Sequence, residues 1–144
     1  MKIVVQRVLQ ASVSVNNIQG ASINRGYLLY VCVEKTDTEK TAKKAAEKII
    51  HLRIMPDDSR PINASIQTTG GEILVVSQFT LCADTSGRRP SFLTAAPPET
   101  ASTLLTLFVS ELTANGISCK TGEFGQHMAV SSLNDGPVTI ILNM

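Results

Sequence analysis

Short apolar runs alternate with polar residues through the first part of the chain. The runs KIVVQRV, ASVSV and GYLLYVCV lie between residues 2 and 33, and the turn-forming stretches NNIQG and NRG separate them. A period of two that is interrupted by turn signals is typical of strands joined by tight turns. The pattern predicts a β-meander over residues 2–33.

The period changes to three or four residues in two later segments. Over residues 36–50 an apolar stripe follows the sequence TDTE, in which Thr36 and Glu39 can form a capping box. Over residues 99–114 a second stripe is preceded by two prolines and followed by Asn-Gly. The sequence therefore predicts two amphipathic helices.

The remaining apolar runs complete the expected fold. Residues 70–84, GGEILVVSQFTLCAD, are too continuously apolar for a strand with one wet face, so we expect burial on both sides. Short strands are expected near residues 117–121, 127–133 and 137–143. No repeat or linker interrupts this order, and we predict one α/β domain over residues 1–144, with many strands and two helices packed on a sheet.

Composition narrows the class of protein. The chain has 144 residues, no run of apolar residues long enough to span a membrane, and no secretory signal pattern, so a cytoplasmic protein is expected. A net charge of +1 gives no basic excess for wrapping DNA or RNA, so any nucleic-acid contact must be local. Three widely spaced cysteines predict reduced thiols, and their spacing indicates no metal site.

Polar groups gather at the end of one predicted strand, in the sequence VVSQFTL. Ser77, Gln78 and Thr80 there need hydrogen-bond partners or a chemical role. One interpretation is that they cap the strand end. The other is an acyl-transfer site, with Thr80 as nucleophile or with backbone N–H groups as an oxyanion hole.

A catalytic triad has little support in the sequence. His51 and His127 are the only histidines, and neither has a spacing that ties it to a hydroxyl or a thiol. Cys82 directly follows the polar segment, but its apolar neighbours favour a core thiol over a reactive thiolate.

Two arginines lie in a glycine- and proline-containing loop, SGRRPSF. The guanidinium groups of Arg88 and Arg89 can hold phosphates or carboxylates, or they are two solvated charges on a turn. One such loop would suit a single-stranded RNA end better than a duplex.

The motifs taken together resemble one family, the D-aminoacyl-tRNA deacylases. The resemblance rests on QRV at 6–8 followed by ASVSV, SQFTL at 77–81, RRPSF at 88–92 and NDGPVT at 134–139, in order over nearly the whole chain. SQFTL and NDGPVT together are highly specific, whereas either alone would be weak. The chain departs from the family at Pro61 and Ile62, and at His127, where an acidic residue is frequent.

The resemblance implies a fold, an activity and an assembly. It implies a three-layer α/β/β fold with largely antiparallel, barrel-like sheets and two main helices. It also implies a homodimer that hydrolyses the ester between a D-amino acid and the 3′-terminal adenosine of tRNA, while rejecting L-aminoacyl-tRNA. If the L-side chain is rejected by a clash with backbone, glycyl-tRNA should be cleaved as well, because glycine has no side chain. Neither a cofactor nor a metal is expected, and the expected partner is the tRNA 3′ end, with no DNA and no membrane.

The resemblance also implies the site residues. A cis Gly136-Pro137 corner would enter the active site of the other subunit and aim its carbonyls at the substrate's α-carbon and amino group. Arg7, Asn134 and Met128 would support this chiral selection. The segment of Ser77, Gln78, Phe79 and Thr80 would position the reaction, and Arg88 and Arg89 would contact tRNA.

Two alternatives remain open at the level of sequence. One is a sister branch of the superfamily that acts on L-aminoacyl-tRNA with relaxed chirality. The other is a non-catalytic protein that binds RNA ends through the lysines of the first helix and the two loop arginines. For Arg7 alone, the alternative to a role in chiral selection is an exposed arginine on a strand edge.

Overall fold

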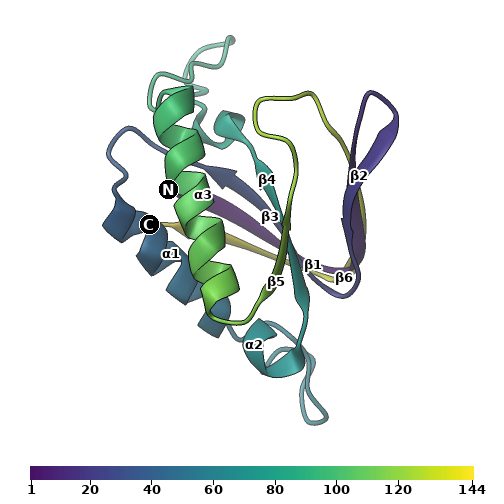
Figure 1. The fold of residues 1–144 in the computed structure, drawn as a ribbon. Helices are drawn as coiled ribbons and strands as arrows, with labels where there is room; N and C mark the ends of the chain where they lie inside the picture. Colours follow the sequence, from purple (N-terminus) through teal and green to yellow (C-terminus); the bar gives the residue numbers. More distant parts are fainter.

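The computed structural model describes residues 1–144, and its strands form one six-stranded sheet (Figure 1). The strands are β1 (Lys2–Val15), β2 (Ile18–Ile23), β3 (Gly26–Cys32), β4 (Glu72–Ser77), β5 (Ser118–Thr121) and β6 (Ala129–Asn143). The helices are α1 (Glu39–His51), α2 (Ile66–Thr69) and α3 (Pro98–Ala114), and a short 3₁₀ turn, η1 (Phe79–Cys82), follows β4. No helix is long and apolar enough to cross a membrane.

The first three strands do not form the predicted meander. Both β2 and β3 pair with the same edge of β1: β3 pairs with residues 2–8 and β2 with residues 11–15. The opposite edge of β1 pairs with β6. The meander is wrong because β1 has 14 residues, enough to hold two shorter strands in succession. The pairs β3–β4 and β4–β5 are parallel, which makes the sheet mixed.

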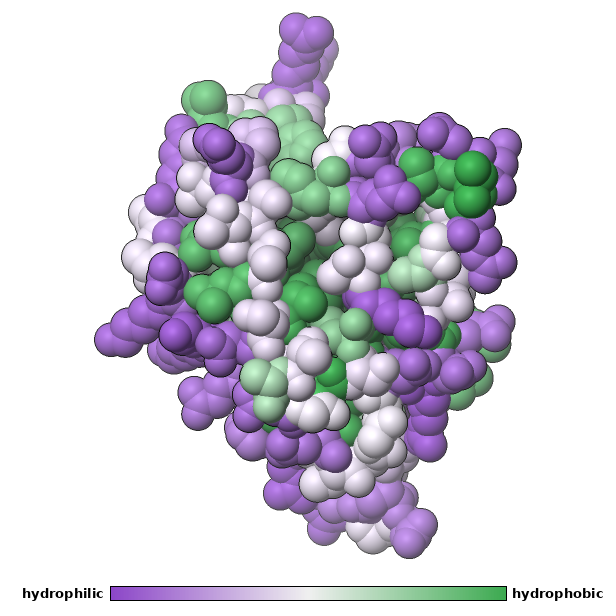
Figure 2. Space-filling model, viewed as in Figure 1, coloured by the Kyte–Doolittle hydropathy of each residue, from purple (hydrophilic) through white to green (hydrophobic).

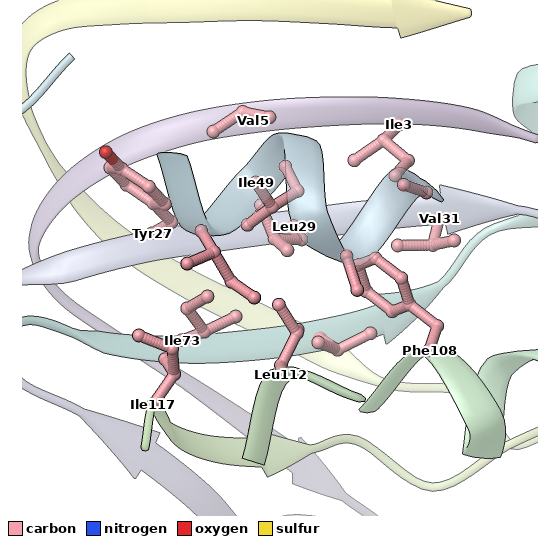
Figure 3. Close-up of a cluster of buried hydrophobic side chains, with 14 of the residues drawn as sticks. Ile3, Val5, Tyr27, Leu29, Val31, Ile49, Ile73, Phe108, Leu112 and Ile117 are labelled. Atoms are coloured by element: carbon pink, nitrogen blue, oxygen red, sulfur yellow. The ribbon is translucent and has the colours of Figure 1, made fainter. Parts of the chain in front are cut away.

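Two apolar cores lie on opposite faces of the central strands. On β4, Ile73 and Val75 pack under the two long helices, whereas Leu74 and Val76 pack on the other side. Figure 3 shows the first core, in which Phe108 of α3 and Ile49 of α1 lie against strand residues. Because β4 is covered on both faces, its run is continuously apolar, as expected. The predicted three-layer fold with two main helices is confirmed.

The helices begin close to the predicted positions. α3 occupies Pro98–Ala114, as its pattern indicates. For α1 the capping box is formed by Thr38 and Thr41, so the prediction of Thr36 and Glu39 is wrong. The reason is Asp37, whose carboxylate accepts the Glu34 N–H and the chain's terminal ammonium, which closes a turn before the helix can begin.

The two strands predicted near the C-terminus are one strand, β6. Its register against β1 shifts between Gln6 and Val8 and again between Val8 and Gln10. The sequence NDGP at 134–137 lies at this irregularity, with a cis Gly136-Pro137 bond. The corner therefore interrupts the ladder of a long strand and does not end it.

A disulfide joins Cys32 at the end of β3 to Cys82 in η1, so the prediction of reduced thiols is wrong for this pair. The two cysteines are 50 residues apart in sequence. Parallel pairing of β3 with β4 brings their ends together, and spacing along the chain carries no signal of that proximity. Cys119 stays free, and burial raises the pKa of its thiol to about 12.

Reducing the disulfide is expected to lower the stability of the fold. Closing a loop of 50 residues removes entropy from the unfolded chain, which stabilises the native state by about 4 kcal/mol. Thermal unfolding with and without a phosphine reductant measures this, with a fall of about 10 °C expected. Cys32→Ser should reproduce the fall, and Cys119→Ser is the control. Equal melting of oxidised and reduced protein would contradict the prediction.

Candidate active site

A cavity of about 760 Å³ opens beside the end of β4. Its walls come from the ends of β3 and β4, the start of α3, and the loop that precedes β6. Figure 2 shows apolar residues gathered in the middle of this face. Most of the lining is apolar, with a few polar groups at the end of β4 and in the loop before β6, as in sites that bind a small organic group.

One wall of the cavity is the segment that ends β4 and leads into η1. Ser77, Gln78 and Phe79 all line the cavity. The Gln78 N–H still donates to the Val31 carbonyl of β3 at 2.8 Å, and the chain then leaves the sheet and turns into η1. The first N–H groups of such a turn have no carbonyl partner within it, so they can meet an anionic oxygen.

Thr80 is exposed and is not among the residues that line the cavity. Its hydroxyl oxygen accepts a short hydrogen bond from the Gln78 side-chain amide. An amide cannot take a proton from a hydroxyl, and a nucleophilic threonine needs a base in contact with it. The geometry therefore favours a positioning role for Thr80 over a nucleophilic one.

The arginine loop joins the rim of the cavity. Asp84 and Ser91 pair across its base, and hydrogen bonds from Ser86 lower the pKa of the Asp84 carboxyl. Phe92 also lines the cavity, and its ring packs edge-to-face on Phe79 with 5.1 Å between centroids. Arg88 and Arg89, between these contacts, are exposed and form no ion pair.

The loop before β6 forms the wall opposite the helix. Met128, half-buried, lines the cavity together with the exposed His127. A Cβ at Gly122 would lie 2.5 Å from the Met128 sulfur, so a larger residue there would displace the Met128 side chain. His51 ends α1, away from this lining, and Cys82 is in the disulfide. His127 makes no hydrogen bond to a hydroxyl or a thiol, so no catalytic triad is present.

Arg7 is buried, with 4% of its surface exposed, so the interpretation as an exposed arginine on a strand edge is wrong. One Nη atom donates to the carbonyls of Ile54 at 2.8 Å and Pro61 at 2.6 Å. On the other side Nε lies 3.1 Å from the Asp135 carboxylate and 3.3 Å from the Asp135 carbonyl. Arg7 thus ties the loop after α1 to the corner of β6. Asp135 was not predicted, because an aspartate before glycine indicates only a turn.

Burial and charge act on the tyrosine beside Arg7. Tyr27 pairs with Arg7 across β1 and β3, and its hydroxyl donates to the Leu52 carbonyl at 3.3 Å. Burial raises the pKa of the Tyr27 phenol, and the Arg7 charge opposes this only in part. Tyr27 therefore stays neutral and acts as packing beneath the guanidinium.

The Gly136-Pro137 corner is exposed at the surface. Gly136 has φ +121°, a conformation that L-residues rarely adopt. A Cβ there would lie 2.9 Å from the Val138 side chain and 3.5 Å from an Arg7 nitrogen. Asn134, also exposed, accepts a hydrogen bond from the Ser132 hydroxyl at 3.3 Å.

Within one chain the predicted residues form two separate groups. The first, at the cavity, contains Ser77, Gln78, Phe79 and Met128, with Thr80, Arg88 and Arg89 beside it. The second, at the corner of β6, contains Arg7, Asn134, Gly136 and Pro137, and no member of it lines the cavity. A sequence motif gives the members of each group, but not the distance between the groups.

Comparisons with known proteins identify the class. A family model described as "D-Tyr-tRNA(Tyr) deacylase" matches residues 4–143. The D-aminoacyl-tRNA deacylase of Roseiflexus castenholzii is 51% identical over 144 residues, covering 99% of this chain and 92% of that one. The D-aminoacyl-tRNA deacylase of Teredinibacter turnerae is 48% identical over 143 residues, covering 99% of both chains.

Solved structures agree in fold. One titled "c-Myc DNA Unwinding Element Binding Protein" has a TM-score of 0.94 and 38% identity, covering 100% of this chain and 99% of that one. A second, a probable eukaryotic D-amino acid tRNA deacylase, has a TM-score of 0.84 at 18% identity over 99% and 98% of the chains, which supports the fold alone. The matches define an enzyme that hydrolyses carboxylic esters. Within that class the chain belongs to the D-Tyr-tRNA(Tyr) deacylase family, and the resemblance drawn from the motifs is confirmed.

Proposed function

We propose that this chain clears D-aminoacyl-tRNA by hydrolysing the ester between the D-amino acid and the 3′-terminal adenosine, in the cytoplasm. The deacylase activity follows from family membership and from relatives about half identical over the full length. The observation that carries the proposal is that the family match, residues 4–143, includes both the cavity segment and the corner of β6. Its direct test is hydrolysis of matched D- and L-esters.

The active unit in this proposal is a homodimer. The corner of β6 is exposed and lies outside the cavity lining of its own chain. Around it, β6 pairs only with β1, and Leu133 and Ile141 expose 52% and 68% of their surfaces. An open edge with apolar side chains favours docking of a second copy about a two-fold axis. Each corner would then enter the cavity of the other subunit.

Mixed dimers test this arrangement. Gly136→Ala damages the corner, and Ala101→Trp fills the cavity from α3. Each variant alone should be nearly inactive. After unfolding and refolding together in equal amounts, half of the dimers are hybrids, each with one intact site, so about a quarter of wild-type activity should return. A mixture that stays inactive would show that cavity and corner act within one chain.

Chiral selection in this proposal is steric. The carbonyls of Gly136 and Pro137 would lie against the substrate's α-carbon and leave room there only for its hydrogen atom. In a D-substrate the side chain then points away from these carbonyls. An L-substrate with the same amino-group contact would drive its side chain into backbone. Rejection by a clash with fixed backbone exceeds the 1 to 3 kcal/mol that is roughly available from one methylene contact.

Glycyl-tRNA should therefore also be cleaved, because glycine has no side chain to clash. Release of labelled glycine from glycyl-tRNA, at enzyme concentrations that spare an L-ester, checks this. Complete resistance at high enzyme concentration would contradict the steric account.

The chemistry needs orientation more than a nucleophile. Water adds to the ester carbonyl, the bond to the 3′-oxygen breaks, and the released oxygen takes up the proton. The ribose 2′-hydroxyl of the substrate can help activate the water, while backbone N–H groups of the 77–80 segment stabilise the oxyanion. No metal or cofactor enters this scheme.

Thr80→Ala should keep measurable activity, within about tenfold of the wild type, because only the hydrogen bond with Gln78 is lost. Single-turnover hydrolysis of a D-ester measures the chemical step. A folded variant that loses many orders of magnitude would restore the nucleophile reading.

Arg88 and Arg89 are proposed to hold the phosphates of the tRNA end. Both are exposed on the loop that ends at Phe92 on the cavity rim. A binding protein without catalysis would use the same two residues, and it would show salt-sensitive association without loss of the ester.

A further inference from the structure

One exposed carboxylate organises the loop that follows α1. An oxygen of Asp57 accepts the Ser59 N–H at 2.9 Å, the Ser59 hydroxyl at 2.7 Å and the Arg60 N–H at 2.9 Å. The other oxygen accepts the side-chain amide of Asn63. These bonds lower the pKa of the Asp57 carboxyl to about 2, so it is ionised at neutral pH.

Asn63 is held from two sides. Arg53 donates to its backbone carbonyl at 2.5 Å and to its side-chain oxygen at 2.7 Å. Backbone bonds between Met55 and Ala64, at 2.9 and 2.8 Å, close the two ends of the loop. The backbone between Asp57 and Asn63 is thus fixed by side-chain bonds at both ends, although its residues are mostly exposed.

The same loop provides an anchor for Arg7. The Pro61 carbonyl, between Asp57 and Asn63, accepts a 2.6 Å hydrogen bond from the buried guanidinium, next to the Ile54 carbonyl at 2.8 Å. The opposite side of the guanidinium binds Asp135, directly before Gly136. The planar guanidinium is buried and hydrogen-bonded on both sides, so neither the loop nor the corner can move alone without breaking a hydrogen bond. The position of the loop therefore affects the position of the corner.

We propose that Asp57 is a positioning residue for chiral selection: it fixes the turn that holds the Pro61 carbonyl, and through Arg7 it fixes the corner at Gly136. This inference rests on the proposed role of that corner. Asp57 itself lies at the surface and does not line the cavity, so it acts through the loop and Arg7 and not on substrate.

Asp57→Ala tests the inference, with Asp58→Ala as the matched control. Asp58 is the next residue, is exposed, and makes no side-chain hydrogen bond or ion pair. We measure kcat and KM for D-tyrosyl-tRNA at catalytic enzyme concentrations, and kcat/KM for L-tyrosyl-tRNA with the enzyme in large excess. The proteins are wild type, both variants, and Asp57→Asn, which keeps one accepting oxygen. Thermal melting is recorded in parallel, because a purely structural role would change melting without changing the ratio of D- to L-hydrolysis.

The expected result is a fall of about tenfold in the D-to-L ratio of kcat/KM for Asp57→Ala, mainly through kcat. Asp57→Asn should recover part of it, Asn63→Ala should show the same direction, and Asp58→Ala should match the wild type. Ratios within twofold of the wild type for both Asp57→Ala and Asn63→Ala would overturn the inference while leaving the proposed function intact. A wild-type protein without preference for the D-ester would remove the proposed function, and this inference with it.

Discussion

Gly136→Ala should lower kcat/KM for a D-aminoacyl ester by about 100-fold or more. At φ +121° an alanine is strained, and its Cβ would lie 2.9 Å from the Val138 side chain and 3.0 Å from the Val138 nitrogen. The corner must shift to relieve these contacts, and its carbonyls shift with it. Misplacing a positioning group by about 1 Å costs on the order of 100-fold in rate.

Gly116 provides the control for that substitution. It also has positive φ, +82°, at the end of α3, but a Cβ there would meet nothing within 4 Å. Gly116→Ala should therefore carry a similar backbone cost in thermal melting and keep wild-type kinetics. Equal kcat/KM values for the two variants would contradict the role given to the corner.

Arg7→Leu should lower the free energy of unfolding by about 3 kcal/mol or more. It leaves the carbonyls of Ile54 and Pro61 without their donor and removes the ion pair of the partly buried Asp135. Breaking such a pair from one side costs about 3 to 5 kcal/mol, because the remaining polar groups stay desolvated.

Urea unfolding measures this loss, and two variants set its scale. Arg7→Lys keeps the charge but not the planar fork, so it should fall between wild type and Arg7→Leu. Arg25→Leu, on an exposed turn, should change stability by less than about 0.5 kcal/mol. Arg7→Leu with wild-type stability would contradict the contacts assigned to Arg7.

Patterns within single segments of the sequence predicted much of the fold. The α3 stripe and the continuously apolar β4 were predicted because each depends on a period or a burial pattern along one segment. The meander and the separate C-terminal strands failed because pairing partners are chosen by long-range contacts. β1, with 14 residues, accommodates three neighbours, and the irregular stretch of β6 stays paired to it.

The candidate site, like the fold, was predicted where one segment carried the signal and missed where distant segments meet. The family motifs indicated Gln78 and Gly136, but no pattern along the chain predicts that Arg7 is buried between a loop 54 residues later and a corner 128 residues later. The Cys32–Cys82 disulfide was missed for the same reason, because a parallel pairing created the contact. That the cavity and the corner lie apart is visible only in the folded chain and could not be predicted from the sequence.

Hydrolysis of D-tyrosyl-tRNA and L-tyrosyl-tRNA, side by side with catalytic amounts of protein, tests the central claim most directly. We predict rapid release of labelled D-tyrosine while the L-ester remains at its rate of spontaneous hydrolysis. Equal loss of both esters would contradict chiral selection by the β6 corner, and loss of neither would contradict the deacylase itself.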